Sequence, residues 1–361
     1  MHRIALAITR GANAGINFPR DPSGDSAPRS FVFEEAFAPI WDESILEGTD
    51  SWDAIPKWWR MARELQYHDA EYDAIVSWGE KLSLAMMMRH RRSSSERPHI
   101  AMMYQFEKPN IRVPLNICKK NLHAVVTWSS VQRNALIQRI RFPRERVYLV
   151  RHYVDQLFYR PRGAIEEDMF CAVGAEMRDY ATLLDATRGA GYRCHIATDH
   201  VRIPGRLRLL ADRRVPIESL NAQADPQITA GRMSLEELRH LYARSKFVVV
   251  PLLPSDTDNG ITCILEAMAM GKPVICSRTR GQVDAVQEGV TGLYVPIGDA
   301  AALRRAISSL WNEPARAREM GKNARDYIEK HHSLEGFTSA VRSAVEASLD
   351  GRPAPDTWWG Q

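Results

Sequence analysis

The sequence has few of the features that mark secreted, zinc-binding or membrane-spanning proteins. Its five cysteines are widely spaced and odd in number, and no C-x-x-C pair occurs, so it predicts neither a disulfide framework nor a zinc ribbon. The first residues, MHRIALAITRG, include no apolar segment of signal-peptide length, and no run is long enough to span a bilayer. We therefore expect a cytoplasmic protein, and leave open peripheral contact with the inner face of the membrane.

A strong excess of one charge is also missing. The chain has 48 basic and 44 acidic residues, which are interspersed and give a net charge of +4. This balance suits an anionic ligand, but no basic stripe with interleaved aromatic residues occurs, so we expect no nucleic-acid partner. The densest basic run, RHRR at Arg89–Arg92, has two interpretations: a solvated loop, or a contact to a phosphate or lipid headgroup.

Length and patterning predict two domains of the α/β class. A chain of 361 residues exceeds the size at which one core keeps growing. Apolar runs of strand length alternate with helical patterns, which favours doubly wound parallel sheets with helices on both faces. The pattern is weakest at Phe158–Phe170, where Pro161, Gly163 and a short acidic run predict a linker. We therefore expect two Rossmann-like domains, residues 1–160 and 161–332, with the ligand between the carboxyl ends of their sheets.

Particular elements can be predicted from these runs. RIALAIT at Arg3–Thr9 is expected to be a buried strand, and Trp52–His68 an amphipathic helix. Ser234 and Glu237 form an S-x-x-E capping box, which predicts a helix start. Further helices are expected near Tyr180–Arg188, Ile261–Met270, Asp299–Asn312 and Ala315–His331.

The segment with the clearest chemistry is DTDNGITCILEAMAMGKPVI, from Asp256 to Ile275. It follows the apolar run KFVVVPLLP and predicts a strand, a glycine-containing loop, a helix and another strand. We expect the loop, with Asn259, to present the unpaired backbone N–H groups of Gly260, Ile261 and Thr262 to a cleft. Together with the helix dipole these groups predict an anion site, and Gly260 allows the ligand to approach the backbone closely.

Two carboxylates flank that anion site in the predicted helix and loop. Glu266 lies one turn beyond Thr262 on the same helix face, among apolar neighbours, where an unpaired carboxylate is costly. It suits a vicinal diol, so we predict that the helix start binds a diphosphate, Glu266 binds the ribose and Asp258 faces the group beyond the diphosphate. An Asp-x-Asp pair also occurs in metal sites, but one such triplet is expected by chance in a chain of this length, and we expect no metal.

The same residues resemble the donor-binding segment of family 4 glycosyltransferases with the GT-B fold. The resemblance rests on the acid-x7-Glu pair Asp258 and Glu266, on EAMAMGKPV at Glu266–Val274, and on EGVTGLYVPIGD at Glu288–Asp299. It implies retaining transfer of a sugar from a nucleotide-sugar co-substrate, with no cofactor and no metal. The acceptor is expected to be a sugar, a lipid-linked sugar or a small molecule.

The resemblance also implies roles for parts of the chain. Residues 1–160 are expected to form the acceptor-side domain and residues 161–332 the donor domain. A helix at 333–350 is expected to cross back to the first domain, followed by a tail at 351–361. The loop after the first strand of the donor domain begins at Gly174, and its Arg178 in "RDY" is assigned to the diphosphate, as in an "RDY"-type variant.

The chain departs from the family pattern at several positions. Asp258 replaces the usual first Glu, and Ala175 replaces an Arg. The region IAMMYQFEKPN lacks the family's His, so no general base is predicted, and the departing phosphate can take the acceptor's proton. Gly11 and Gly15, after the first strand, are expected near the reacting sugar and the acceptor.

Two residue roles and the function itself have alternative interpretations. Arg178 could instead pair with Glu176 or Asp179 in a surface cluster, and Gly260 could serve only the turn. A nucleotide-sugar epimerase of the same fold, and a degenerate nucleotide-sugar-binding regulator or scaffold, are the rival functions.

Overall fold

The chain forms two compact units in a computed structural model. The structure describes residues 4–8, 40–41, 57–67, 69–91, 97–106, 108–198, 200–203, 213–216 and 227–359. Among these, unit 1 contains the described residues up to His152 and those from Leu334 onward, and unit 2 contains Tyr153–Ser333.

The division between the units falls earlier in the chain than the predicted linker. Val154, Phe158 and Tyr159 are buried in the core of unit 2. Their side chains therefore belong to the second unit, although Pro161 and Gly163 follow them. The last long helix, α12 (Leu334–Leu349), belongs to unit 1.

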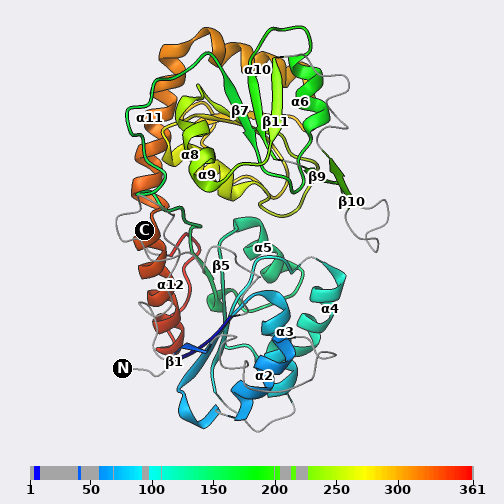
Figure 1. Cartoon of the computed structure of the whole chain (residues 1–361). Helices are drawn as coiled ribbons and strands as arrows, with labels where there is room; N and C mark the ends of the chain where they lie inside the picture. Colours follow the sequence, from blue (N-terminus) through cyan, green and yellow to red (C-terminus); the bar gives the residue numbers. More distant parts are fainter. Residues whose placement is uncertain are drawn as a thin grey trace. The chain divides into compact units, whose positions relative to one another are not determined.

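Unit 1 is built on a six-stranded parallel sheet, in which Figure 1 labels β1 and β5. The strand order is β2-β1-β3-β4-β5-β6. Side chains from three helices share one core with β4, β5 and β6, so these helices cover the same face of the sheet. On α12, the carbonyl oxygen of Ser348 contacts Nε2 of His123 at 2.8 Å. The strands are β1 (Ile4–Ile8), β2 (Ile40–Trp41), β3 (Ala74–Trp78), β4 (His99–Met102), β5 (Ala124–Thr127) and β6 (Val147–Leu149). The three helices are α3 (Glu80–His90), α4 (Pro109–Cys118) and α5 (Ser130–Gln138), and α2 is Lys57–Tyr67.

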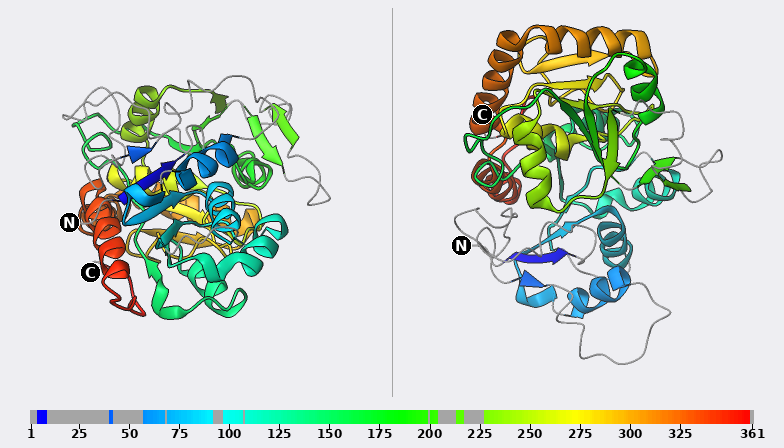
Figure 2. Two further views of the ribbon diagram at one scale, coloured as in Figure 1. Left: turned by 90° about the horizontal axis from the view of Figure 1, so that it is seen from below. Right: turned by 45° about the horizontal axis from the view of Figure 1, so that its top comes forward.

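Unit 2 contains a second six-stranded parallel sheet, in the order β11-β8-β7-β12-β13-β14. Helices α6 and α10 share a core on one face, and α8 and α9 share a core on the other, with α11 contributing to both (Figure 2). The strands are β7 (Phe170–Val173), β8 (Cys194–Ala197), β11 (Ile228–Gly231), β12 (Val248–Val250), β13 (Val274–Ser277) and β14 (Gly292–Val295). The helices are α6 (Tyr180–Thr187), α8 (Leu235–Arg244), α9 (Ile261–Ala269), α10 (Ala300–Asn312) and α11 (Pro314–His331).

Local sequence accounts for most of these elements. The central strand β12 is fully buried, as its continuous apolar sequence predicts for a strand covered on both faces. The capping box that starts α8 is confirmed: Ser234 Oγ accepts from Glu237 N at 3.2 Å, and Glu237 Oε2 accepts from Ser234 N at 2.7 Å. Of the predicted helix at Trp52–His68, residues 57–67 form α2 and the remainder lies outside the described residues.

Two features of unit 2 were not predicted. An antiparallel hairpin of β9 (His200–Ile203) and β10 (Arg213–Pro216) follows β8, and β11 pairs at the edge of the sheet. Their residues are mixed polar and apolar and lack a buried-strand pattern, so pairing partners rather than local propensity determine them. Among the described helices, none combines the length and apolar character needed to cross a membrane.

Candidate functional site

The sheet of unit 2 has a topological switch point between β7 and β12. These two strands pair with each other. From β7 the chain passes through α6 to β8 on one side, and from β12 it passes through α9 to β13 on the other. The loops after β7 and β12 therefore diverge at the carboxyl edge of the sheet. Ligands of open α/β sheets bind at such a point.

Backbone hydrogen bonds join the two diverging loops. Asp179 N donates to Pro251 O at 3.0 Å, and Leu253 N donates to Met177 O at 2.9 Å. Met177 has a φ of 57°, a left-handed conformation that is rare for a residue with a side chain. The loop after β7 is thus held in one conformation by the loop after β12.

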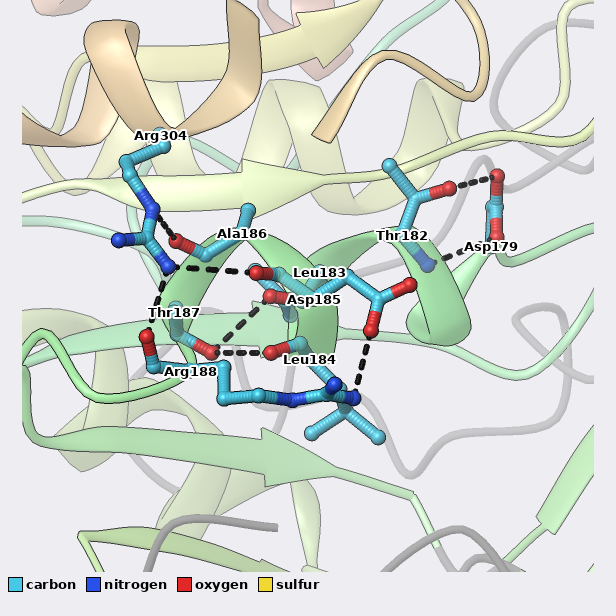
Figure 3. Close-up of polar contacts among 9 residues, drawn as sticks. All are labelled: Asp179, Thr182, Leu183, Leu184, Asp185, Ala186, Thr187, Arg188 and Arg304. Carbon is cyan, nitrogen blue, oxygen red and sulfur yellow. Dashed lines mark hydrogen bonds and ion pairs between the residues drawn. The ribbon is translucent and has the colours of Figure 1, made fainter. Parts of the chain in front are cut away.

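Helix α6 fixes the other end of the first loop (Figure 3). Asp179 caps the helix, accepting from Thr182 N at 3.1 Å and from Thr182 Oγ1 at 2.7 Å. At the far end, Arg304 of α10 donates to the carbonyl oxygens of Ala186 and Arg188, both at 2.7 Å. Because its carboxylate caps α6, Asp179 does not pair with Arg178.

Arg178 lies buried between the two loops. Its guanidinium donates to Val173 O at 2.8 Å, to Glu176 O at 2.7 Å and to Cys263 Sγ at 3.0 Å. No carboxylate among the described residues forms an ion pair with it, and the residue is only 6% exposed. The predicted alternative of a surface cluster is therefore wrong. A buried cation without an anionic partner is costly, so this position favours an anion.

Two glycines with left-handed backbone conformations lie next to that guanidinium. Gly174 has a φ of 95°, and a Cβ there would lie 2.5 Å from Arg178 Nη2. Gly260 has a φ of 85°, and a Cβ there would lie 3.0 Å from a Val250 methyl and 3.6 Å from Arg178 Nη1. Gly174 therefore makes room for the guanidinium, whereas Gly260 serves the turn, where only glycine adopts its φ without strain, and a close approach to Val250.

The start of α9 presents backbone N–H groups next to Arg178. Gly260 is the N-cap residue, and no side chain caps the helix. One prediction was wrong: Ile261 N is not unpaired, because it donates to Asp258 O at 3.1 Å. Within the described residues, the N–H groups of Gly260 and Thr262 have no hydrogen-bond partner, so they and the helix dipole remain to bind an anion.

Glu266 is held inside the unit by two tyrosines. Tyr242 Oη donates to Glu266 Oε2 at 2.8 Å, and the Tyr159 hydroxyl also hydrogen-bonds to this carboxylate. Burial raises the pKa of Glu266 to about 7, and the two phenols oppose the rise. From the sequence we expected a ligand diol to pair with this carboxylate. In the folded chain the two tyrosine hydroxyls already pair with it. A carboxylate accepts about four hydrogen bonds, so it retains capacity for a diol.

Asp258 is as buried as Glu266, each being 9% exposed. Burial raises its pKa to about 7, and the charge of Asp284 adds to the rise. Its Oδ2 atom is buried without a hydrogen-bond partner in the described structure. A buried oxygen of this kind points to a ligand group that donates a hydrogen bond.

A neighbouring loop holds the backbone around Asp258. Gln282 Nε2 donates to Asp258 O at 3.2 Å and to Asn259 O at 3.1 Å. The Asn259 side chain donates to Ser255 Oγ at 2.6 Å, so it braces the turn rather than facing outward. At Gly281 a Cβ would lie 2.1 Å from Thr257 O, which shows how closely the two loops approach.

Four residues of this site were not predicted from the sequence: Tyr159, Tyr242, Cys263 and Gln282. None lies in a turn motif or carries a charge, and Cys263 was noted only as one of five widely spaced cysteines. No signal in the sequence alone singles out a tyrosine on α8 as the partner of Glu266. In unit 1, Gly11 and Gly15 lie outside the described residues.

The described residues show no arrangement of three or more His, Cys, Asp or Glu side chains able to hold a metal ion. The two carboxylates of the Asp-x-Asp triplet also have different surroundings. Asp256 lies 3.3 Å from Arg280 in a partly exposed ion pair, whereas Asp258 is buried beneath the turn.

Comparisons with known proteins agree with the fold. Residues 214–327 match the family model described as glycosyl transferases group 1. D-rhamnosyltransferase WbpZ of Pseudomonas aeruginosa is 37% identical over 95 residues, which covers 26% of this chain and 25% of that protein. Sulfoquinovosyl transferase SQD2 of Arabidopsis thaliana is 30% identical over 127 residues, covering 34% and 24% respectively. The chain therefore matches only about a quarter of the length of these curated relatives.

Solved structures match nearly the whole chain. A glycosyltransferase from Rickettsia africae superposes with a TM-score of 0.69 at 14% identity, covering 96% of this chain and 97% of that one. Anabaena Alr3699/HepE, solved with UDP and glucose, superposes with a TM-score of 0.68 at 14% identity, covering 96% and 100%. These likenesses confirm the predicted fold class: two Rossmann-like α/β units of the GT-B type. Assignment to family 4 and to its "RDY" variant stays a prediction.

Proposed function

We propose that this chain is a retaining glycosyltransferase that moves a sugar from a nucleotide-sugar to an acceptor in polysaccharide, glycolipid or glycoconjugate biosynthesis. The observation that carries the proposal is the buried guanidinium of Arg178, without an acidic partner, beside the open N-terminus of α9. A diphosphate supplies the missing negative charge at this position. The group 1 match and the UDP-bound neighbour support a nucleoside diphosphate there.

We place the donor along α9. The diphosphate contacts the N–H groups of the first turn and the free N–H bonds of Arg178. The ribose hydroxyls donate to Glu266, which Tyr242 and Tyr159 hold in place. The sugar lies toward Asp258, whose unpartnered Oδ2 accepts from a sugar hydroxyl.

The reaction follows from this placement. The bond between the anomeric carbon and the diphosphate oxygen breaks, and the acceptor hydroxyl oxygen bonds to the same face of that carbon. The departing diphosphate takes the acceptor's proton, so atoms and charges balance without a separate base. Arg178 and the α9 dipole stabilise the negative charge that grows on the leaving diphosphate. We propose that this stabilisation needs no metal held by the protein.

Binding of nucleoside diphosphates tests the proposal. We expect one nucleoside diphosphate from a panel of uridine, guanosine, adenosine and thymidine forms to raise the unfolding temperature in proportion to the logarithm of its concentration. The matching nucleotide-sugar should be hydrolysed slowly in the absence of an acceptor. Release of an epimerised sugar would favour an epimerase, and binding without any turnover would favour a scaffold. If no nucleoside diphosphate stabilises the protein, the proposed function is wrong.

A further inference from the structure

Helix α4 of unit 1 exposes two aliphatic side chains that its own fold does not cover. Val113 is 54% exposed and Ile117 is 58% exposed, and they lie one helical turn apart. The opposite side of α4 buries Ile111, Leu115 and Cys118 against the sheet core. The helix therefore has an apolar side that packs and a second, smaller apolar row that faces outward.

Exposed cations flank the aliphatic pair along the chain. Arg112 is exposed on α4 one residue before Val113, and Lys120 is exposed in the 3-10 turn Lys119–Asn121 that follows the helix, three residues after Ile117. Lys108, at the helix N-cap, is exposed as well.

The charge of this region is strongly one-sided. From Lys108 to Arg144 the sequence has eight Lys and Arg residues and no Asp or Glu, whereas the whole chain has a net charge of +4. Asp356, from the C-terminal segment, pairs with Arg133 and Arg144. Among the described residues, no acidic side chain pairs with Lys108, Arg112, Lys120 or Arg141.

The 3-10 turn after α4 packs against two neighbouring segments, one of which carries a further exposed cation. Lys119 of this turn donates to Ile140 O, which places the turn beside the exposed Arg141. Asn121 Nδ2 donates to Met87 O at 3.1 Å, so the last turn of α3 also lies there. Lys108 does not stabilise α4 through the helix dipole, because the dipole favours acidic residues at the start of a helix.

We propose that the α4 surface, defined as Lys108, Arg112, Val113, Ile117, Lys120 and Arg141, docks on a bilayer that contains anionic phospholipids. The aliphatic row enters the boundary between headgroups and acyl chains, and the cations contact lipid phosphates. The chemistry favours lipid over other partners. A single-stranded nucleic acid needs aromatic stacking partners, and α4 has none. Two aliphatic side chains would also bury far less surface than the ~800 Å² that each partner of a stable dimer buries.

Vesicle co-sedimentation tests this surface without any donor or acceptor, so its result is independent of the proposed catalysis. The full chain is mixed with vesicles of phosphatidylcholine alone, or of phosphatidylcholine with phosphatidylglycerol, at low and at raised salt. We expect binding only to the anionic vesicles, weakening as salt rises. The double variant Arg112→Gln/Lys120→Gln should reduce partitioning about fivefold per removed charge. The double variant Val113→Ser/Ile117→Ser should reduce it about tenfold or more.

Matched controls separate this surface from general effects. Arg305→Gln/Arg318→Gln removes two exposed cations of α10 and α11, and Ile165→Ser/Val290→Ser removes two exposed aliphatic side chains of unit 2. Both controls should bind like the parent chain, and all four variants should unfold at the parent's temperature. Equal binding to neutral vesicles, or equal losses in the controls, overturns the proposal. The proposal is also overturned if light scattering shows a dimer that the Val113→Ser/Ile117→Ser variant abolishes. Binding to a homopolymeric RNA in preference to vesicles would overturn it as well.

Discussion

Replacing Glu266 by Gln should make the free protein more stable at alkaline pH and weaken its binding of nucleoside diphosphates. In the folded chain burial raises the pKa of Glu266 from the usual 4.5 to about 7. The folded state therefore binds a proton more tightly than the unfolded state does. Stability from this group is fully present below pH ~4.5 and is lost as the pH rises through ~7. A glutamine cannot ionise, so the variant does not suffer this loss.

The size of the effect follows from the pKa difference. One pKa unit corresponds to about 1.4 kcal/mol. Near pH 8 the ionised Glu266 destabilises the folded chain by about 2–3 kcal/mol, and near pH 5 by less than about 1 kcal/mol. Urea unfolding at the two pH values should therefore show Glu266→Gln more stable than the parent near pH 8 and close to it near pH 5. Asp258 is the other carboxyl whose pKa burial raises to about 7; it is the same in both proteins, so its contribution to the stability difference cancels.

Ligand binding should change in the opposite direction. A ribose diol donates to an ionised carboxylate more strongly than to an amide oxygen, by about 1 kcal/mol or more per hydrogen bond. Isothermal titration near pH 8 should show nucleoside diphosphate affinity about 10-fold lower or more for Glu266→Gln. Tyr242→Phe is the companion variant, because it keeps the ring but removes the donor 2.8 Å from Glu266. It should lose stability near pH 8 by about 1–2 kcal/mol and little near pH 5. Unchanged stability near pH 8 for Glu266→Gln would show that the carboxyl is not desolvated, and unchanged affinity would refute the ribose assignment.

Three further predictions concern the loops around the site. Asp258→Asn should lower turnover by about 10-fold or more while changing nucleoside diphosphate affinity less than about threefold, because we place the Asp258 carboxylate next to the sugar. Equal losses in steady-state kcat and in titrated affinity would contradict this placement. Arg178→Lys should weaken nucleoside diphosphate binding by about 10-fold, since an ammonium lacks the planar fork, and unaltered affinity by titration would leave Arg178 a purely structural role. Gly281→Ala should destabilise the chain by about 2 kcal/mol or more in urea unfolding, because its Cβ would lie 2.1 Å from Thr257 O. The control Gly231→Ala has open space around the added Cβ and should be close to neutral. Equal effects of the two variants would show that the two loops do not approach so closely.

Much of the fold was predictable because it depends on local patterns. Continuous apolar runs such as Val248–Val250 indicate strands buried on both faces, and the Ser234–Glu237 capping box marks the start of α8. The glycine loop and the helix at Ile261 were predicted from turn chemistry and helical period. The β9–β10 hairpin and the edge strand β11 were not predicted, because their short sequences mix polar and apolar residues and lack the continuous apolar run of a buried strand.

The site was predictable only in part. Asp258, Gly260 and Glu266 lie in one short segment, so their spacing alone places them around the start of α9. The partners of these residues come from other elements: Tyr242 from α8 and Gln282 from the loop after β13. No spacing rule connects residues that are brought together only when the sheet forms.

Residues close together in the chain were enough to indicate the class of fold, the anion-binding helix start and its two carboxylates. The electrostatics of the site, in contrast, depend on segments that meet only on folding. These segments bury Arg178 without an acidic partner, enclose Asp258 and Glu266 so that the pKa of each rises to about 7, and give Glu266 its tyrosine donors. Desolvation and hydrogen bonding depend on which distant segments cover a group, and that arrangement exists only in the folded chain.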